Sequence, residues 1–207
     1  KTGFQKVGSK QVYYGNDGIM GYGEQKIAGK WYLFDTVTGA MKTGFQKVGS
    51  KQVYYGNDGI MGYGEQKIAG KWYLFDAVTG AMKTGFQKVG SKQVYYGNDG
   101  IMRYGEQKIA GKWYLFDTVT GAMKTGFQKV GSKQVYYGND GIMRYGEQKI
   151  AGKWYLFDAV TGAMKTGFQK VGSKQVYYGN DGSMRYGEQK IAGKWYLFDT
   201  VTGAMKN

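Results

Sequence analysis

Carboxylates and aromatic rings are the side chains of this sequence that could do chemistry, and both recur at a fixed spacing. Asp17, Glu24 and Asp35 each return every 41 residues, five times in all. The sequence contains no cysteine and no histidine, which excludes thiol nucleophiles, imidazole bases and the usual zinc ligands. A catalytic group normally occurs once in a shaped pocket, whereas identical copies are typical of a multivalent binder or a spacer. We therefore predict that the chain is not an enzyme and uses no cofactor and no metal ion.

The elements that must position these residues are repeats. Five copies, residues 1–41, 42–82, 83–123, 124–164 and 165–205, and two further residues account for all 207 residues, so we predict a single array over 1–207. Glycine recurs about every five residues, each copy has one leucine, and proline is absent, which excludes helical repeats, leucine-rich repeats and collagen. No window approaches ~18 consecutive apolar residues, so we expect no membrane span.

Each repeat divides again into two related halves, residues 2–20 and 22–41 of the first copy. Each half has two short runs of strand-forming residues around a two-residue turn, Gly8-Ser9 or Ala28-Gly29, which predicts a β-hairpin. Because an isolated hairpin is marginal in water, neighbouring hairpins must stack. The sequence predicts an all-β solenoid of stacked hairpins, two in each repeat, and a β-propeller is the less favoured alternative.

The turns determine which side chains share a side of each hairpin. If Ile27 pairs with Lys30, then Lys26 pairs with Trp31 and Glu24 with Leu33, and paired residues lie on the same side. The side predicted to form the core contains Val7, Val12, Tyr14, Ile27, Tyr32 and Phe34. The opposite side, called the outer side below, contains Phe4, Lys6, Gln11, Tyr13, Glu24, Lys26, Trp31 and Leu33.

This pattern resembles the cell-wall-binding repeats, also called choline-binding or glucan-binding repeats, of Gram-positive surface proteins, phage endolysins and glucan-synthesising enzymes. Their half-repeat reads T-G-W, a turn, W-Y-Y-F and G-x-M. The matching segments here are Thr2-Gly3-Phe4, Gln11-Val12-Tyr13-Tyr14 and Gly18-Ile19-Met20, then Tyr22-Gly23-Glu24, Trp31-Tyr32-Leu33-Phe34 and Gly39-Ala40-Met41. The resemblance covers all ten halves and implies a left-handed superhelix of hairpins in an extracellular, cell-wall-associated protein.

In the choline binders, the resemblance implies a cage between successive hairpins. Its rings are the T-G-W tryptophan, the leading residue of W-Y-Y-F and an aromatic of the next hairpin, and cation–π attraction holds the quaternary ammonium. Here Phe4 is accompanied by Gln11, and Trp31 by Glu24, so no half supplies both of its rings. We expect instead a mixed site at a hairpin junction, formed by Trp31 and Glu24 with the Phe4- and Tyr13-type rings of neighbours, which also suits a sugar.

The predicted ligand-binding residues are Trp31, Trp72, Trp113, Trp154, Trp195, Tyr13, Tyr54, Tyr95, Tyr136, Tyr177, Phe4, Phe45, Phe86, Phe127, Phe168, Glu24, Glu65, Glu106, Glu147 and Glu188. Two alternatives need no ligand. The tryptophans could only fill gaps between stacked hairpins, and Glu24 could form a surface ion pair with Lys26 or Lys6.

The net charge of +14 favours a polyanionic partner. Teichoic acid and acidic glycans fit, whereas nucleic acid is disfavoured because no DNA- or RNA-binding motif is present. We predict a non-catalytic module that anchors a larger protein to wall polysaccharide or to teichoic acid, with or without choline. The alternatives are a structural spacer or stalk, and the α-glucan-binding domain of a glucan-synthesising enzyme.

The copies differ at position 21 of the repeat. Gly21 and Gly62 are replaced by Arg103, Arg144 and Arg185 in the last three copies. Because the position accepts both residue types, we expect its side chain to be exposed and its φ angle to be ordinary.

Overall fold

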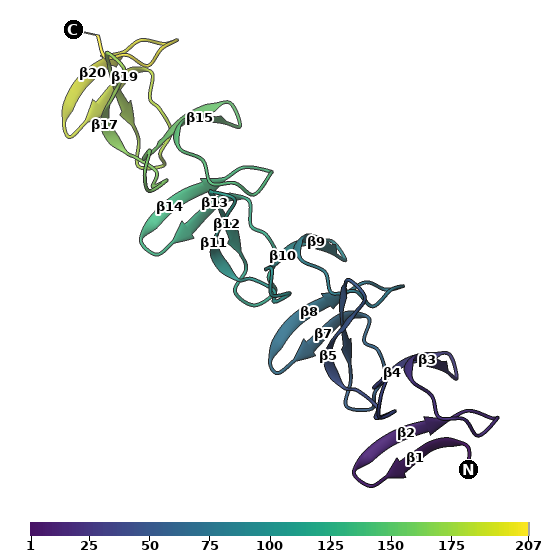
Figure 1. Ribbon diagram of the computed structural model, residues 1–207. Coiled ribbons are helices and arrows are strands. Elements are labelled where there is room, and N and C mark those ends of the chain that lie inside the picture. Colours follow the sequence, from purple (N-terminus) through teal and green to yellow (C-terminus); the bar gives the residue numbers. More distant parts are fainter. Residues whose placement is uncertain (207) are drawn as a thin grey trace. The chain divides into compact units, whose positions relative to one another are not determined.

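A computed structural model describes residues 1–206, so the last residue of the predicted array, Asn207, lies outside the described residues. The contacts divide the chain into two compact units, Lys1–Arg103 and Tyr104–Asn207, and the packing reported below applies within each unit (Figure 1). The boundary falls inside the third repeat, between its two hairpins.

In residues 1–206, all regular structure is β-strand, in ten hairpins of two alternating types. The first-type hairpins are β1 (Gly3–Val7) with β2 (Lys10–Tyr14), β5 (Gly44–Val48) with β6 (Lys51–Tyr55), β9 (Gly85–Val89) with β10 (Lys92–Tyr96), β13 (Gly126–Val130) with β14 (Lys133–Tyr137), and β17 (Gly167–Val171) with β18 (Lys174–Tyr178). The second-type hairpins are β3 (Gly23–Ile27) with β4 (Lys30–Phe34), β7 (Gly64–Ile68) with β8 (Lys71–Phe75), β11 (Gly105–Ile109) with β12 (Lys112–Phe116), β15 (Gly146–Ile150) with β16 (Lys153–Phe157), and β19 (Gly187–Ile191) with β20 (Lys194–Phe198).

Each hairpin is a separate two-stranded sheet. The predicted all-β array of hairpins is therefore confirmed, and residues 1–206 form no four-stranded propeller blade. The same residues contain no helix with the length and hydrophobicity needed to span a membrane.

The predicted register is confirmed residue by residue. Ile27 pairs with Lys30, and Lys26 with Trp31. The connecting turn has positive φ at both positions, 47° at Ala28 and 80° at Gly29, as a type I′ turn requires. Alanine in this left-handed conformation costs roughly 1–2 kcal/mol, so the strand pairing imposes a turn that residue 28 itself disfavours.

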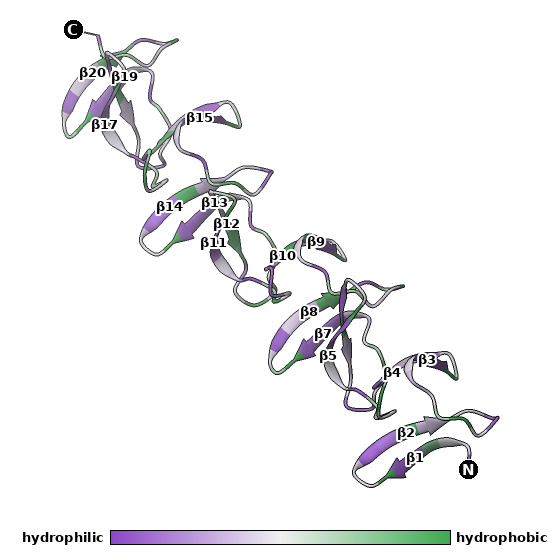
Figure 2. Ribbon diagram, viewed as in Figure 1, coloured by the Kyte–Doolittle hydropathy of each residue, from purple (hydrophilic) through white to green (hydrophobic). Residues whose placement is uncertain are grey.

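The predicted core side is also confirmed. Phe34 and Tyr55 are fully buried, and Val12 is 1% exposed. Val7 is half exposed in the first hairpin, whereas its counterpart Val48 packs against a buried cluster in the next copy. Figure 2 shows hydrophilic and hydrophobic residues mixed along each short strand, without a long hydrophobic run. Burial therefore depends on the neighbouring hairpin as well as on the hairpin's own fold.

Within each unit, the segment after the second and later hairpins connects each hairpin to the one before. Its methionine lies beside the last residue of its own second strand, as Met41 does beside Phe34. The Met41 N–H donates to the carbonyl of Gln11 in the preceding hairpin at 2.7 Å, and Met61 N–H donates to the carbonyl of Trp31 at 2.9 Å. One backbone hydrogen bond of this kind thus holds successive hairpins in the same relative position.

Candidate functional site

Alternation of the two hairpin types gives each unit two kinds of junction. At an aromatic junction, the outer side of a first-type hairpin faces the core side of the second-type hairpin that follows. At a Trp–Glu junction, the outer side of a second-type hairpin faces the core side of the next first-type hairpin. Both kinds occur in both units, and their side chains differ completely.

Four rings meet at the aromatic junction. The Phe4 ring lies 5.1 Å from Tyr13 on its own hairpin and 5.1 Å from Tyr32 on the next, measured between ring centroids. Phe34 lies 6.4 Å from Phe4 and 6.3 Å from Tyr13. The same contacts recur around Phe45, Phe127 and Phe168. Pairs at these separations stabilise by ~0.5–1.5 kcal/mol beyond the area that they bury.

An open cavity of about 550 Å³ lies beside these rings in the second unit. It is lined by Phe127, Gln134, Tyr155, Met164, Asn180 and Asp181. Three successive hairpins or their connectors supply these residues. Phe127 and Tyr155 touch each other at 5.0 Å between centroids, so they form a tilted two-ring platform and not two separated walls of a cage. Gln134 supplies an amide where a third ring would complete the enclosure.

The Trp–Glu junction combines apolar packing with a buried polar contact. Trp31 and Leu33 pack against Tyr55 and Met61 of the following hairpin. The Tyr55 hydroxyl donates to Glu24 Oε1 at 3.2 Å. Corresponding bonds join Tyr96 to Glu65 at 3.3 Å and Tyr178 to Glu147 at 3.2 Å.

The hydroxyl groups at this junction stay protonated. Burial is the main cause that raises the pKa of Tyr55 well above its usual range, and the negative charge of Glu24 adds to it. In the junction at Glu106, the buried hydroxyl of Tyr137 has no partner within hydrogen-bond geometry, although the same two causes raise its pKa. The tyrosine therefore remains a hydrogen-bond donor, and it donates to the carboxylate in three of the four described Trp–Glu junctions.

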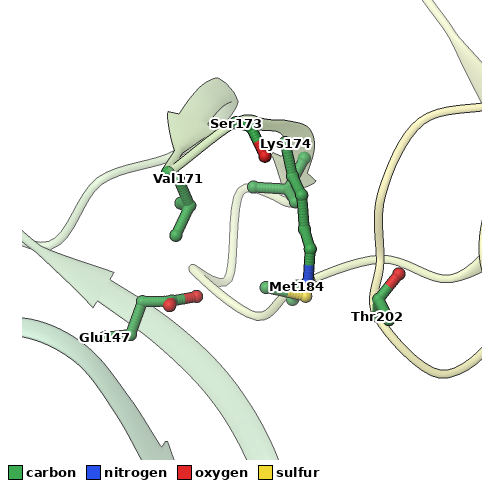
Figure 3. A pocket seen from close by; sticks show the side chains of 8 residues that line it. Glu147, Val171, Ser173, Lys174, Met184 and Thr202 are labelled. Carbon is green, nitrogen blue, oxygen red and sulfur yellow. The ribbon is translucent and has the colours of Figure 1, made fainter.

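In each unit, a Trp–Glu junction borders a pocket lined by side chains of both charges. The pocket in the first unit has a volume of about 210 Å³ and is lined by Glu24, Trp31, Lys51, Met61, Tyr63, Val78 and Thr79. The corresponding pocket in the second unit, about 290 Å³, is lined by Glu147, Val171, Gly172, Ser173, Lys174, Val176, Met184 and Thr202. Figure 3 shows the Glu147 carboxylate and the Lys174 side chain entering this space from different hairpins.

Four of the tryptophans also have a cation of their own hairpin nearby. Lys26 Nζ lies 5.9 Å from the centre of the Trp31 ring, and the same contact occurs at Trp72, Trp113 and Trp195. This distance is within the range of cation–π attraction. The interaction was missed from sequence, although the predicted Lys26–Trp31 pairing already placed both side chains on one side of the hairpin.

The following hairpin covers the tryptophan. Trp195, on the last hairpin, is 68% exposed, whereas Trp113, which is followed by β13 and β14, is 36% exposed. Packing between hairpins is thus part of what the tryptophan does, and it leaves an accessible portion of the ring.

The structure divides the predicted site residues between the two junctions. Phe4- and Tyr13-type residues line aromatic junctions, and Trp31- and Glu24-type residues line Trp–Glu junctions, so the four types do not form one mixed site. The reason is that Phe4 and Tyr13 share the outer side of their hairpin and meet only the hairpin that follows. Phe86 and Tyr95 lie on the last hairpin of the first unit, and no hairpin follows Glu188 and Trp195 in the described residues.

Two further outcomes concern charge. Within residues 1–206, Glu24 forms no ion pair with Lys26 or Lys6, and it accepts the Tyr55 hydrogen bond instead. Sequence reasoning missed Lys51, Met61 and Thr79, which reach the pocket from neighbouring elements. The described part of the chain has no group of three acidic residues placed to hold a metal ion.

The model of one protein family, described as the choline-binding repeat, matches residues 1–44, 42–84, 83–125, 124–167 and 165–207. The chain belongs to this family. It is accordingly a binding module built of repeats. A sequence search finds no matching curated protein.

Solved structures share the fold over nearly the whole chain. CbpJ from Streptococcus pneumoniae TIGR4 is 25% identical with a TM-score of 0.74, and the match covers 99% of this chain and 87% of CbpJ. Choline-binding protein F from Streptococcus pneumoniae, solved with a peptidoglycan analogue, is 27% identical with a TM-score of 0.78, covering 98% and 79%. The choline-binding domain of CbpL from the same species, at 22% identity and a TM-score of 0.66, covers 90% and 98% and shares the fold. The predicted hairpin solenoid is thereby confirmed.

Proposed function

We propose that the chain anchors a larger protein to the Gram-positive cell wall by binding wall polysaccharide at its Trp–Glu junctions. The observation that supports this most directly is the pocket where Trp31, Glu24, Lys51 and Thr79 come together. A sugar ring can lay its C–H face against the indole while its hydroxyl groups bond to the carboxylate, ammonium and hydroxyl groups around it.

Repetition makes weak sites sufficient. Each unit contains two Trp–Glu junctions, at Glu24 and Glu65 in the first unit and at Glu106 and Glu147 in the second. When the geometry lets several sites of the protein bind one polymer at the same time, binding is ~10²- to 10⁴-fold stronger than at a single site. A net charge of +14 adds attraction to anionic wall polymers such as teichoic acid. An extracellular, wall-associated location follows from this role.

A choline headgroup at the aromatic junction is the second candidate. Phe127, Tyr155 and Met164 line an open cavity where the family resemblance places the ammonium cage. A cation within about 6 Å of a ring centre gains cation–π attraction. Because Gln134 replaces one ring, we expect this site to hold choline more weakly than a full cage.

Retention on purified Gram-positive cell walls tests both candidates. One variant replaces Glu24, Glu65, Glu106 and Glu147 by Gln, which keeps an oxygen for the tyrosine hydroxyl and removes the charged acceptor. Its matched control replaces Phe4, Phe45, Phe127 and Phe168 by Leu, which alters only aromatic junctions. We expect the Glu→Gln variant to lose at least about tenfold in retention, since each charge-assisted hydrogen bond is worth roughly 1.5–3 kcal/mol. Wall oligosaccharides should release the unaltered protein.

The other outcomes identify the alternatives. Release by choline, together with loss of retention in the Phe→Leu variant alone, would assign binding to the aromatic junctions. Release by α-glucan oligosaccharides would identify a glucan-binding domain. Retention that is equal for both variants and abolished only by salt would leave a basic stalk without a specific site, because screened surface charges would then account for all binding.

A further inference from the structure

A further pocket lies on the connector between the two hairpins of the first repeat. It has a volume of about 410 Å³ and is lined by Tyr13, Gly15, Asp17, Ile19, Met20, Gly21, Tyr22 and Gln25. The polysaccharide contacts proposed above do not use it. Its one charged side chain is Asp17, which forms no ion pair among the described residues.

The later repeats place an arginine at this position. Arg103 Nη2 donates to Asp99 Oδ2 at 2.8 Å, and the same pair forms between Arg144 and Asp140 at 2.8 Å. The guanidinium lies directly on the backbone of Gly97, because a Cβ added there would be only 2.9 Å from Arg103 Nε. The expectation of a freely exposed side chain is therefore corrected: the Arg103 side chain is 31% exposed.

The first repeat leaves the same space open. The atoms nearest to a Cβ added to Gly15, the counterpart of Gly97, belong to the Asp17 side chain and the carbonyl of Ile19. The expected ordinary φ at Gly21 is confirmed, since Gly21 is not among the residues with positive φ. The backbone is thus the same with and without the arginine side chain.

The acceptor is held in place whether or not the arginine is present. Ile19 N–H donates to Asp17 Oδ1 at 3.0 Å, and Ile101 N–H donates to Asp99 Oδ1 at 3.0 Å. Oδ2, which receives the guanidinium of Arg103 and Arg144, is the free oxygen in the glycine copies, whereas Arg185 bonds to Oδ1 of Asp181 at 2.9 Å. Ile60 N–H and Asp58 form the same 3.0 Å bond in the second repeat. A ligand would therefore meet a carboxylate that is already oriented.

We propose that the pocket at Gly21 and its counterpart at Gly62 bind a guanidinium group from another molecule, such as an arginine side chain of a peptide. The chain's own arginine shows which chemistry the pocket accepts: a planar cation with N–H donors that lies flat on a glycine and bonds to one carboxylate oxygen. A quaternary ammonium has no N–H to donate, and a lysine ammonium is compact and cannot lie flat. The site therefore differs from the candidate choline site in the ligand that it selects.

Titration with N-methylguanidinium at constant ionic strength tests this inference, followed by the NMR shifts of the backbone amides at repeat position 21. The unaltered chain should have two sites. The Gly21→Arg/Gly62→Arg variant should have none, and the Arg103→Gly/Arg144→Gly/Arg185→Gly variant should have five. All these residues occur at the same position elsewhere in the chain, so the fold should persist. We expect dissociation constants of tens of millimolar, which is on the order of one hydrogen bond to a charged group.

Two controls make the result specific. Asp17→Asn/Asp58→Asn keeps an oxygen for the isoleucine amide and removes the charge, and it should weaken binding at least about fivefold. Tetramethylammonium has the same charge without donors and should produce no saturable shift. Equal shifts from the two cations, or an unchanged number of sites in the Gly→Arg variant, would overturn the proposal. Because the test involves no cell wall, its failure is independent of the proposed anchoring function.

Discussion

The aromatic and Trp–Glu junctions use the same backbone for different purposes. Both are held by a methionine N–H that donates to the preceding hairpin, at 2.7 Å from Met41 to Gln11 and 2.9 Å from Met61 to Trp31. At the first kind, rings contact rings across the junction. At the second kind, a tryptophan, a carboxylate and a lysine border a smaller pocket. Sequence differences at a few positions in each half-repeat therefore decide whether a junction consists mainly of packed rings or also presents polar groups.

This contrast suggests a division between stability and recognition. Aromatic junctions bury pairs of rings, each of which contributes to stability beyond its area. Trp–Glu junctions keep charged groups that a purely structural contact would not need. Because the two hairpin types alternate, each Trp–Glu junction has an aromatic junction as its neighbour. The side chains proposed to bind a ligand therefore lie beside hairpins that pack through aromatic rings.

Truncation of a core ring should give the largest effect. Phe157 is 1% exposed and lies 6.3 Å from Phe127 and 6.2 Å from Tyr136. Phe157→Ala should lower the free energy of unfolding by ~3–5 kcal/mol, because it removes a buried ring and leaves a cavity. Chemical denaturation measures the loss. Leu156→Ala, on the Trp–Glu side of the same hairpin, is the control and should cost less because Leu156 is only half-buried. Equal losses would contradict the division between the two junctions.

Removal of one hydroxyl group should give an intermediate effect at the Trp–Glu junction. Tyr178→Phe deletes the 3.2 Å bond to Glu147 and should cost roughly 0.5–1.5 kcal/mol, since Glu147 can regain water only in part. Tyr14→Phe is the matched control, because the described residues include no second-type hairpin that packs against Tyr14 as β15 and β16 pack against Tyr178. Thermal denaturation of the two variants compares them, and a loss of the same size in Tyr14→Phe would show that the tyrosine–glutamate bond contributes nothing.

The fold could be predicted from the sequence in detail because its determinants are local. The two-residue turn at Ala28-Gly29 determines the register, and the register determines which residues share a side. The sequence therefore predicts correctly that Phe34 and Tyr32 lie on the core side of their hairpin. The unfavourable φ angle of Ala28 could not be predicted from residue preference, because the pairing of the two flanking strands imposes the conformation of this turn.

The site could be predicted only in part. The sequence indicates which side of a hairpin Trp31 occupies, but not which groups the next hairpin and its connector bring to it. Lys51 and Thr79 lie 20 and 48 residues after Trp31 and reach its pocket only through stacking. For the same reason, Phe4 was expected near Trp31, although the two occupy successive junctions. The sequence pattern within one hairpin therefore does not predict contacts that depend on the packing between hairpins.

Acid should destabilise the connectors at the two kinds of junction to different degrees. This loss of stability should be the smallest of the three predicted effects. Asp76 Oδ1 accepts hydrogen bonds from Thr79 N at 2.9 Å and Val78 N at 3.1 Å, and Asp76 forms an ion pair with Lys83 at 3.1 Å. The Thr79 backbone bond, followed by Lys83, holds the pKa of Asp76 well below its usual range. Because the pKa is lower in the folded state, this stabilisation is complete above the unfolded-state pKa of ~3.9 and is lost as pH falls below it. Thr79 lines the Trp–Glu pocket, so acid should loosen this junction first.

Thermal denaturation between about pH 6 and pH 2.5 checks this expectation. Replacement of Asp35, Asp76, Asp117, Asp158 and Asp199 by Asn should lower the melting temperature at neutral pH and flatten its fall below about pH 4, because the titrating carboxylates are gone. Asp17→Asn/Asp58→Asn changes connectors in which a single backbone N–H binds the side chain, at 3.0 Å from Ile19 and from Ile60, and it should leave the acid-induced fall in place. If both variants flattened the profile equally, the two connectors would be equivalent, and the Trp–Glu junction would have no acid sensitivity of its own.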